Sequence, residues 1–121
     1  MAESHEIGKL AEKYAANFLQ EKGYTITRTN YRFKSKEIDI IAENKDFVIF
    51  VEVKLRGGFI HQKPEEAVMW KKQKYMVEAA DYYLQSHPTD KEARFDIIAI
   101  EAKKDTWDLK HLEDAFQPRV Q

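Results

Sequence analysis

The chain has 121 residues, of which 43% are hydrophobic and 34% charged, and its formal net charge is −1. This balance predicts a globular protein with a single domain over residues 1–121. The absence of cysteine excludes disulfides and cysteine-based zinc sites. No apolar run approaches the roughly 18 residues of a membrane helix, and the N-terminus lacks the apolar core of a signal peptide. We therefore expect a cytoplasmic protein that does not enter the membrane.

The first half of the chain predicts one helix and three strands. Residues 5–22 place apolar side chains at spacings of three and four, which is typical of an amphipathic helix. Residues 24–33 are rich in Thr, Ile and Tyr, and residues 37–42 and 47–55 are still more apolar, so each range predicts a strand. The polar residues ENKD separate the last two ranges, which predicts a tight turn and an antiparallel hairpin.

The second half predicts a further helix and two strands. RGGFIHQK at 56–63 is expected to be a loop, and Pro64 suits the first turn of a helix that ends near Ser86. Residues 94–100 predict another apolar strand, and residues 106–112 a last strand at an edge of the sheet. The predicted fold class is therefore α/β, with a mixed central sheet flanked by helices in the order αβββαβ and a possible final strand.

Charge is distributed unevenly along the chain. Residues 24–36 carry four basic side chains and no acidic one, and residues 54–63 carry three basic side chains and no acidic one. These stretches could form local basic patches, or they could be scattered charge that keeps the surface soluble. The basic side chains concerned are Arg28, Arg32, Lys34, Lys36, Lys54, Arg56 and Lys63.

A carboxylate and an ammonium group interrupt the apolar strand at 47–55. Glu52 and Lys54 form a Glu-x-Lys triplet, a pattern that occurs three times in the chain. The other two triplets lie in a turn and at a strand end, where solvated charges need no special explanation. An ionised group that is buried without a partner costs several kcal/mol, so buried charges are usually paired or bound to a metal.

The hairpin geometry predicts which side chains lie near Glu52. A turn about residues 44–45 sets Asp39 opposite Phe50 and Glu37 opposite Glu52. Because side chains alternate across a strand, the groups on one face are then Glu37, Asp39, Glu52 and Lys54. Facing carboxylates repel each other, and a divalent cation such as Mg²⁺ would reverse that penalty. The alternative is a hairpin with a solvated polar face, on which Lys54 forms salt bridges.

Several other side chains have two possible roles. Lys72 lies within the apolar row of the second helix, so it either extends to solvent or reaches the acidic cluster or a phosphate. Asp96 is expected to be structural and paired with Arg94. Trp70 and Trp107, with most of the tyrosines, are expected to be core or edge aromatics and not platforms for stacked bases.

The spacing from Asp39 to Glu52-x-Lys54 resembles the signature of the PD-(D/E)XK nuclease superfamily, and the predicted element order resembles its restriction-endonuclease-like fold. The resemblance is closer to the bacterial YraN-like family of uncharacterised proteins, and it extends over nearly the whole chain. Lys36 departs from the family pattern, which has glycine before Glu37. The matching segments are GKLAE at 8–12, TNYR at 29–32, KEIDII at 36–41, IFVEVKLR at 49–56, AADYYL at 79–84 and RFDII at 94–98.

The resemblance implies roles for individual residues. Asp39 and Glu52 would be catalytic metal ligands together with the carbonyl of Val53, and Lys54 would be catalytic and assist the attacking water. Glu12 matches a helical glutamate that completes related sites, although a solvated helix carboxylate is the alternative, and Glu37 would be an outer or alternative ligand. The implied cofactor is Mg or Mn. The implied nucleic-acid-binding residues are Arg28, Arg32, Lys34, Lys36, Arg56 and Lys72.

The leading functional hypothesis is a metal-dependent nuclease that acts on DNA or RNA. One alternative is a nucleic-acid-binding module on the same fold with little or no activity, and another is a non-enzymatic domain that binds a partner protein. A hydrolase needs converging carboxylates and Lys54, whereas a binding module needs only the basic patches. Archaeal Holliday junction resolvases, whose shape the predicted fold resembles, suggest a homodimer.

Overall fold

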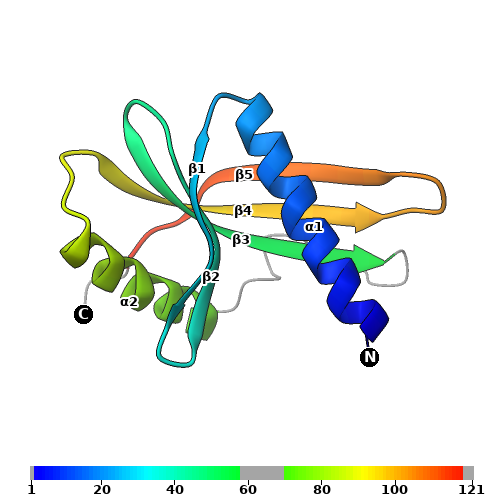
Figure 1. The fold of residues 1–121 in the computed structure, drawn as a ribbon, viewed down its shortest axis with the longest axis horizontal. Helices are drawn as coiled ribbons and strands as arrows, with labels where there is room; N and C mark the ends of the chain where they lie inside the picture. The colour runs from blue at the N-terminus through cyan, green and yellow to red at the C-terminus, as the bar shows by residue number, and fades with distance from the viewer. Residues whose placement is uncertain (1, 58–69, 119–121) are drawn as a thin grey trace.

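The computed structural model describes residues 2–57 and 70–118, and it confirms the predicted order of elements within them. Strand β5 confirms the possible final strand, and the expected helix start at Pro64 lies outside the described residues. Figure 1 shows the arrangement. The elements are α1 (Ala2–Glu21), β1 (Thr25–Phe33), β2 (Lys36–Glu43), β3 (Phe47–Gly57), α2 (Trp70–Ser86), β4 (Glu92–Ala102) and β5 (Trp107–Phe116).

The strands form one mixed five-stranded sheet in the order β1-β2-β3-β4-β5. Strands β3 and β4 pair in parallel, and the other neighbouring strands pair antiparallel. A parallel pair requires a long connection, and here α2 lies within the segment that joins β3 to β4. The predicted fold class is therefore confirmed as a mixed α/β sheet flanked by two helices, consistent with an αβββαβ core.

The two helices lie on opposite faces of the sheet, and each covers its own apolar cluster. Helix α1 crosses in front of β3, β4 and β5 in Figure 1 and packs through Ala15 and Leu19. Helix α2 packs against the other face through Met76 and Tyr83, next to Phe50. The central strand β3 contributes to both clusters because successive side chains point to opposite faces. Its middle is consequently buried on both sides.

The register of the β2–β3 hairpin differs from the predicted one by two residues. Ile41, and not Asp39, lies opposite Phe50. The turn is centred on residues 45–46, since the amide of Asn44 donates to the carbonyl of Phe47 at 3.1 Å. The Asn44 side chain accepts hydrogen bonds from the amides of Asp46 and Phe47, which moves the centre of the turn toward the C-terminus. A shift of two residues preserves the face on which each side chain lies, because strand alternation has a period of two.

Strands β1 and β2 are irregular where they pass Asp39. Ile38 packs in the α2 cluster and Ile40 in the α1 cluster, although a regular strand would direct both to the same face. Asn30 lies across from this point, between the paired residues Thr29 and Tyr31, and its φ of 53° is left-handed. Asn tolerates this region better than most residues. The change of face places Asp39 at a bend.

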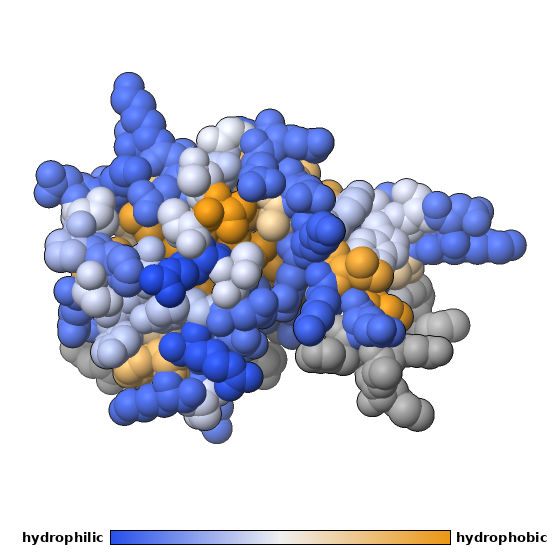
Figure 2. Space-filling view, viewed as in Figure 1, coloured by the Kyte–Doolittle hydropathy of each residue, from blue (hydrophilic) through white to orange (hydrophobic). Residues whose placement is uncertain are grey.

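The surface in the view of Figure 2 is mainly hydrophilic, with apolar side chains gathered in small patches. Ile7 and Leu10 of α1 are exposed, as are three aromatic side chains of α2. No helix within residues 2–57 and 70–118 is long and apolar enough to cross a membrane.

Candidate functional site

Asp39 and Glu52 meet where β2 separates from β3. The described pairing of the two strands ends at Ile40 and Val51, and one further step would bring Asp39 level with Glu52. Instead of continuing the ladder, the Val53 amide donates a hydrogen bond of 2.8 Å to Asp39 Oδ2. A side chain therefore takes the place of a backbone acceptor, and this holds the Asp39 carboxylate beside β3.

Glu52 is buried and Asp39 is half-buried, and burial governs the protonation of both. Glu52 is 5% exposed. Its burial, and next the negative charge of Asp39, raise the pKa of Glu52 to about 7, against the lowering effect of Lys72 and Lys54. Burial also raises the pKa of Asp39, although the Val53 amide, the charge of Lys72 and a hydrogen bond with Glu52 oppose the rise. The two carboxyl groups therefore retain a shared proton up to near-neutral pH.

One oxygen of Glu52 lacks a satisfying partner. Glu52 Oε1 is buried and accepts no hydrogen bond from the described residues. The nearest cation given for it is Lys72 Nζ at 3.6 Å, which is an ion pair but too long for a hydrogen bond. Lys72 thus reaches the acidic cluster, as one of its two predicted roles requires. Because native proteins satisfy nearly all buried polar atoms, this oxygen marks a place where a ligand would gain free energy.

Glu12 brings a third carboxyl group toward the pair from helix α1. Its partial burial raises its pKa, and the charges of Asp39 and Glu37 raise it further, whereas a hydrogen bond with Asn30 lowers it. Its neighbours are therefore those of an acidic cluster and not of a fully solvated helix surface. Glu37 contributes negative charge from β2 and pairs with Arg32 of β1 on its other side. It does not lie opposite Glu52 as predicted, because the β2–β3 register is shifted by two residues and its described pairing ends at Ile40.

The donor atoms suit a hard cation, although they are not assembled as a complete cage. Mg²⁺ and Mn²⁺ prefer carboxylate and carbonyl oxygens, which Asp39, Glu52 and the Val53 carbonyl would supply. Across the described ranges, no group of three or more His, Asp or Glu side chains is close enough together to hold a metal ion. The pair fits such an ion best as two ligands in a shell completed by water, which is usual for Mg²⁺.

The predicted nucleic-acid-binding residues do not form one uniform patch. Arg28 and Arg32 are exposed on β1. Lys34 lies in the turn that follows β1 and is exposed. Lys36 is tied to α2, where it forms an ion pair with Glu78 and lies 4.8 Å from the centre of the Tyr75 ring.

Arg56 is half-buried at the end of β3, and its Nη1 has no hydrogen-bond partner in the part of the chain that the structure describes. Lys63 and most of the predicted 56–63 loop lie outside that part. The basic surface that the structure places is therefore the β1–β2 hairpin and the adjacent face of α2.

The sequence prediction missed two features of this region. One is Asn30 of the TNYR segment, whose one local signal is the tolerance of Asn for positive φ. Trp70 is 46% exposed, Tyr75 36% and Tyr82 50%, so these three side chains lie outside the core. Helical periodicity alone could have placed Tyr82 outside, because Ala79, Ala80 and Tyr83 define the buried face.

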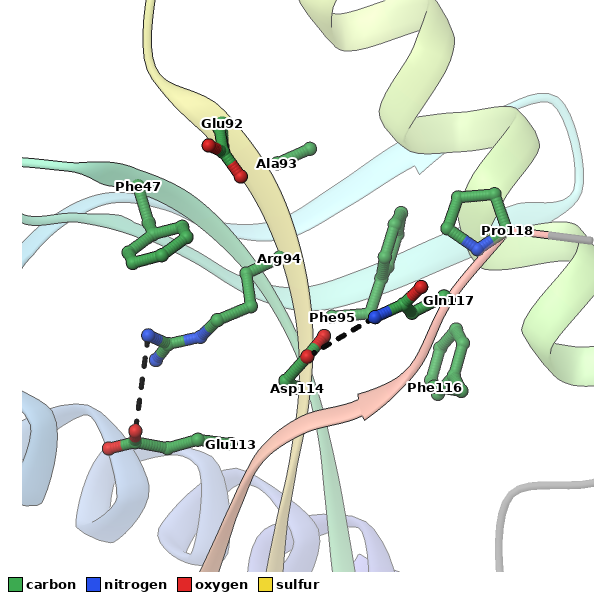
Figure 3. Close-up of a pocket in the computed structure, with 10 residues that line it drawn as sticks. All are labelled: Phe47, Glu92, Ala93, Arg94, Phe95, Glu113, Asp114, Phe116, Gln117 and Pro118. Atoms are coloured by element: carbon green, nitrogen blue, oxygen red, sulfur yellow. Dashed lines mark hydrogen bonds and ion pairs between the residues drawn. The ribbon is translucent and has the colours of Figure 1, made fainter.

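A second polar network lies on β4 and faces the opposite side of the sheet from Glu52. The guanidinium of Arg94 donates two hydrogen bonds to Asp96, at 2.9 and 2.7 Å, which confirms the predicted structural pair. Arg94 also lines a crevice of about 640 Å³ near the ends of β3, β4 and β5, together with Phe47 and Glu113 (Figure 3). Phe47 precedes Glu52 by five residues of extended strand, or about 17 Å. This crevice is therefore separate from the candidate site.

Comparison with known proteins identifies the family. The model of the uncharacterised protein family UPF0102 matches residues 11–100, which contain Asp39, Glu52 and Lys54. A UPF0102 protein of Flavobacterium psychrophilum is 40% identical over 116 residues, which cover 96% of this chain and 98% of that protein. One from Chlorobium phaeobacteroides is 42% identical, with 96% and 97% covered, and one from Bacteroides thetaiotaomicron is 39% identical, with 98% of each covered. The chain belongs to the UPF0102 family, the YraN-like family that its motifs predicted.

Proposed function

We propose that this protein is a metal-dependent nuclease of the PD-(D/E)XK type that hydrolyses phosphodiester bonds of DNA or RNA. The observation that carries the proposal is the pairing of the half-buried Asp39 with the buried Glu52, in which one Glu52 oxygen accepts no hydrogen bond from the described residues. Strongly perturbed pKa values cluster at functional sites, so a carboxyl pair perturbed by burial and like charge is a functional-site candidate. The ion pair with Lys72 does not satisfy this oxygen, because 3.6 Å is too long for a hydrogen bond.

In this proposal the two carboxylates and the Val53 carbonyl hold Mg²⁺ or Mn²⁺, and Glu12 and Glu37 are the candidates for outer positions. The bound ion would lower the pKa of its water and offset negative charge on the phosphate. The Val53 amide fixes the direction of the Asp39 carboxylate. Glu52 must lose its proton to act as a ligand, so the proposed site binds metal better above a pH of about 7.

Lys54 has the proposed role of orienting the attacking water. It follows Glu52 by two residues on β3, so strand alternation directs both to the same face. Its charge acts on Glu52, where it opposes the raised pKa. Lys72 approaches the same carboxylate from α2 and would neutralise a phosphate oxygen. The proposed site therefore has acidic and basic groups from β2, β3 and α2 around one point.

A nuclease panel tests the proposal. Duplex DNA, single-stranded DNA, branched DNA and RNA are incubated with wild-type protein in Mg²⁺, Mn²⁺ or chelator. We expect metal-dependent cleavage of at least one substrate. Lys54→Ala should reduce the rate by at least about 100-fold, since positioned proton-transfer groups contribute factors of this size. Lys103→Ala is the matched control, because Lys103 also ends a Glu-x-Lys triplet but is exposed.

Thermal melts in the same metals separate the alternatives. Metal should stabilise the wild type and not Glu52→Gln, because a ligand stabilises only the state that binds it. Binding of nucleic acid without cleavage or metal-dependent stabilisation would replace the nuclease by the non-catalytic binding module. If the protein neither binds nucleic acid nor cleaves it, the remaining hypothesis is a domain that binds a partner protein.

A further inference from the structure

We infer that α2 and the β1–β2 hairpin form a binding surface for the unpaired bases of single-stranded nucleic acid. This inference rests on the proposed function for its substrate class, and it adds a strand preference and a subsite. The aromatic–lysine surface consists of Lys34, Lys36, Trp70, Lys74, Tyr75 and Tyr82.

The first observation is the exposure of three large aromatic side chains on one helix. Trp70 is 46% exposed, Tyr75 36% and Tyr82 50%, although α2 has a complete buried face without them. Tyr82 is supported from behind by Phe33, whose ring centre is 4.6 Å away with the planes tilted by 30°. The ring is therefore held in place while half of its surface remains available. Rings of this kind serve as stacking platforms for bases, whatever their sequence.

The second observation is that lysines accompany the rings. Lys36 Nζ lies 4.8 Å from the centre of the Tyr75 ring, and Lys74 Nζ lies 5.7 Å from that of Trp70. Lys34 Nζ lies 5.3 Å from the centre of the Phe33 ring, which packs against Tyr82. A single strand binds best where aromatic rings and cations alternate at short intervals, because its bases stack on the rings while its phosphates pair with the cations.

The third observation is the local balance of charge. The pKa of Glu78 is lowered, chiefly by a hydrogen bond from Lys36 and then by the charges of Lys36, Lys74 and Lys34. Three lysines thus surround this one carboxylate. Asp81, which accepts a hydrogen bond from Gln85, is a second carboxylate nearby. Three lysines against two carboxylates leave the local charge positive. The surface is therefore cationic on a chain whose net charge is −1, which favours an anionic partner at this place.

The fourth observation is continuity with the carboxyl pair. Lys72 precedes Tyr75 by three residues on α2, so the two side chains are neighbours on the helix surface, and Lys72 Nζ lies 3.6 Å from Glu52 Oε1. A strand bound along α2 would therefore have a phosphate within reach of the candidate site. A duplex would gain less from the same surface, since paired bases are stacked on each other and present edges, not faces.

The main comparison is between two single strands of equal charge, and it is made in chelator so that the ligands are not cleaved. Wild-type protein is titrated by fluorescence anisotropy against a thymidine oligonucleotide of about 20 nucleotides, against an abasic oligonucleotide of equal length and against a duplex. We expect the thymidine strand to bind at least about tenfold more tightly than the abasic strand, because each stacked base contributes a factor of this order. Equal affinity for these two strands would overturn the inference without any variant.

Variants then locate the platform. Tyr82→Leu and Tyr75→Leu should each weaken binding of the thymidine strand about fivefold or more and leave the abasic strand within about twofold. Tyr82→Phe keeps the ring and should bind like the wild type. Tyr14→Leu removes a tyrosine of similar exposure (43%) from α1 and is the matched control. Equal weakening of all ligands, or an effect of Tyr14→Leu as large as that of Tyr82→Leu, would refute the assignment.

The outcome can be separated from that of the nuclease proposal. If Asp39→Asn and Glu52→Gln retain the preference for the thymidine strand while the wild type cleaves nothing, the binding surface stands and the nuclease proposal fails. If the wild type cleaves but prefers duplex, or treats thymidine and abasic strands alike, the nuclease proposal stands and this inference fails.

Discussion

Glu52 is a residue whose protonation couples the candidate site to the stability of the fold. Its pKa rises from 4.5 to about 7, first because it is buried and then because Asp39 is close. The native state therefore binds this proton more tightly than the unfolded chain does. The resulting stabilisation is complete below pH 4.5 and is lost as the pH rises through about 7.

Glu52→Gln should remove this pH dependence. Relative to the wild type, the free energy of unfolding of the variant should increase by roughly 3 kcal/mol between pH 5 and pH 8, since each pKa unit corresponds to about 1.4 kcal/mol. Urea unfolding of both proteins at the two pH values measures the difference. Glu101→Gln neutralises an exposed carboxylate on β4 and should show no such change. If the free energies of unfolding of Glu52→Gln and wild type differ by the same amount at both pH values, Glu52 is not the titrating group.

Lys54 and Lys72 differ in how the chain positions them. Lys54 belongs to the same strand as Glu52, so the alternation of β3 is sufficient to set its face. Lys72 comes from α2, and only the packing of that helix against the sheet brings its ammonium group toward Glu52. The sequence could therefore assign Lys54 a role near Glu52, while it left two possibilities for Lys72.

At the level of elements, the irregular β1–β2 hairpin shapes the site. Asn30 has a φ of 53° at the point where Asp39 leaves the regular pairing with β1. A left-handed conformation costs a residue with a Cβ about 1–2 kcal/mol, and Asn and Gly pay less than Ala.

Asn30→Ala should consequently lower the free energy of unfolding by about 1 kcal/mol, whereas Asn30→Gly should stay within about 0.5 kcal/mol of the wild type. Urea unfolding of the three proteins provides the measurement. At an ordinary strand position the order would be opposite, because Gly is the less favourable residue there. Finding Ala better than Gly would mean that the left-handed conformation of Asn30 is not retained in solution.

At the scale of the molecule, the Asp96 network joins elements that are distant in the chain. Asp96 is fully buried on β4. It accepts hydrogen bonds from Arg94, from His111 of β5 at 2.7 Å and from the Asp114 amide at 3.0 Å. Arg94 continues to the Tyr24 hydroxyl at 2.7 Å, just beyond α1. Burial alone would raise the pKa of Asp96, but the bonds from His111 and Arg94 hold it below its usual value.

Asp96→Asn should therefore destabilise the whole fold, by about 3–5 kcal/mol, because it leaves the buried Arg94 without its counter-charge. Chemical denaturation at neutral pH gives the value, and the exposed Glu101→Gln on the same strand is the control, with an expected change below about 0.5 kcal/mol. A loss under about 1 kcal/mol would show that the network is not a structural centre. Asp96 pairs with Val51 on β3 and therefore faces the opposite side of the sheet from Glu52, so metal-dependent stabilisation of the surviving fold should persist.

Local patterns were sufficient for the elements, the family and the hairpin that carries the acidic pair. Amphipathic spacing predicted α1 and the buried part of α2, and the hairpin brought Asp39 close to Glu52 even though its turn was placed one residue too early and its register was two residues off. A register error of two residues leaves the alternation of β3 unchanged, whereas the bend at Asp39 breaks the alternation of β2 and was not predicted. Each of these properties depends mainly on residues that are close in the sequence, so a local sequence pattern can predict it.

Tertiary packing alone decided how the charges are used. The partnership of Lys36 with Glu78, the approach of Lys72 to Glu52 and the exposure of Tyr82 all depend on where α2 lies against the sheet. The raised pKa of Glu52 likewise depends on burial by several elements at once and on a neighbouring charge from β2. These are interactions between segments far apart in the sequence, and their sign and size follow from distance and desolvation, which no local pattern of residues records.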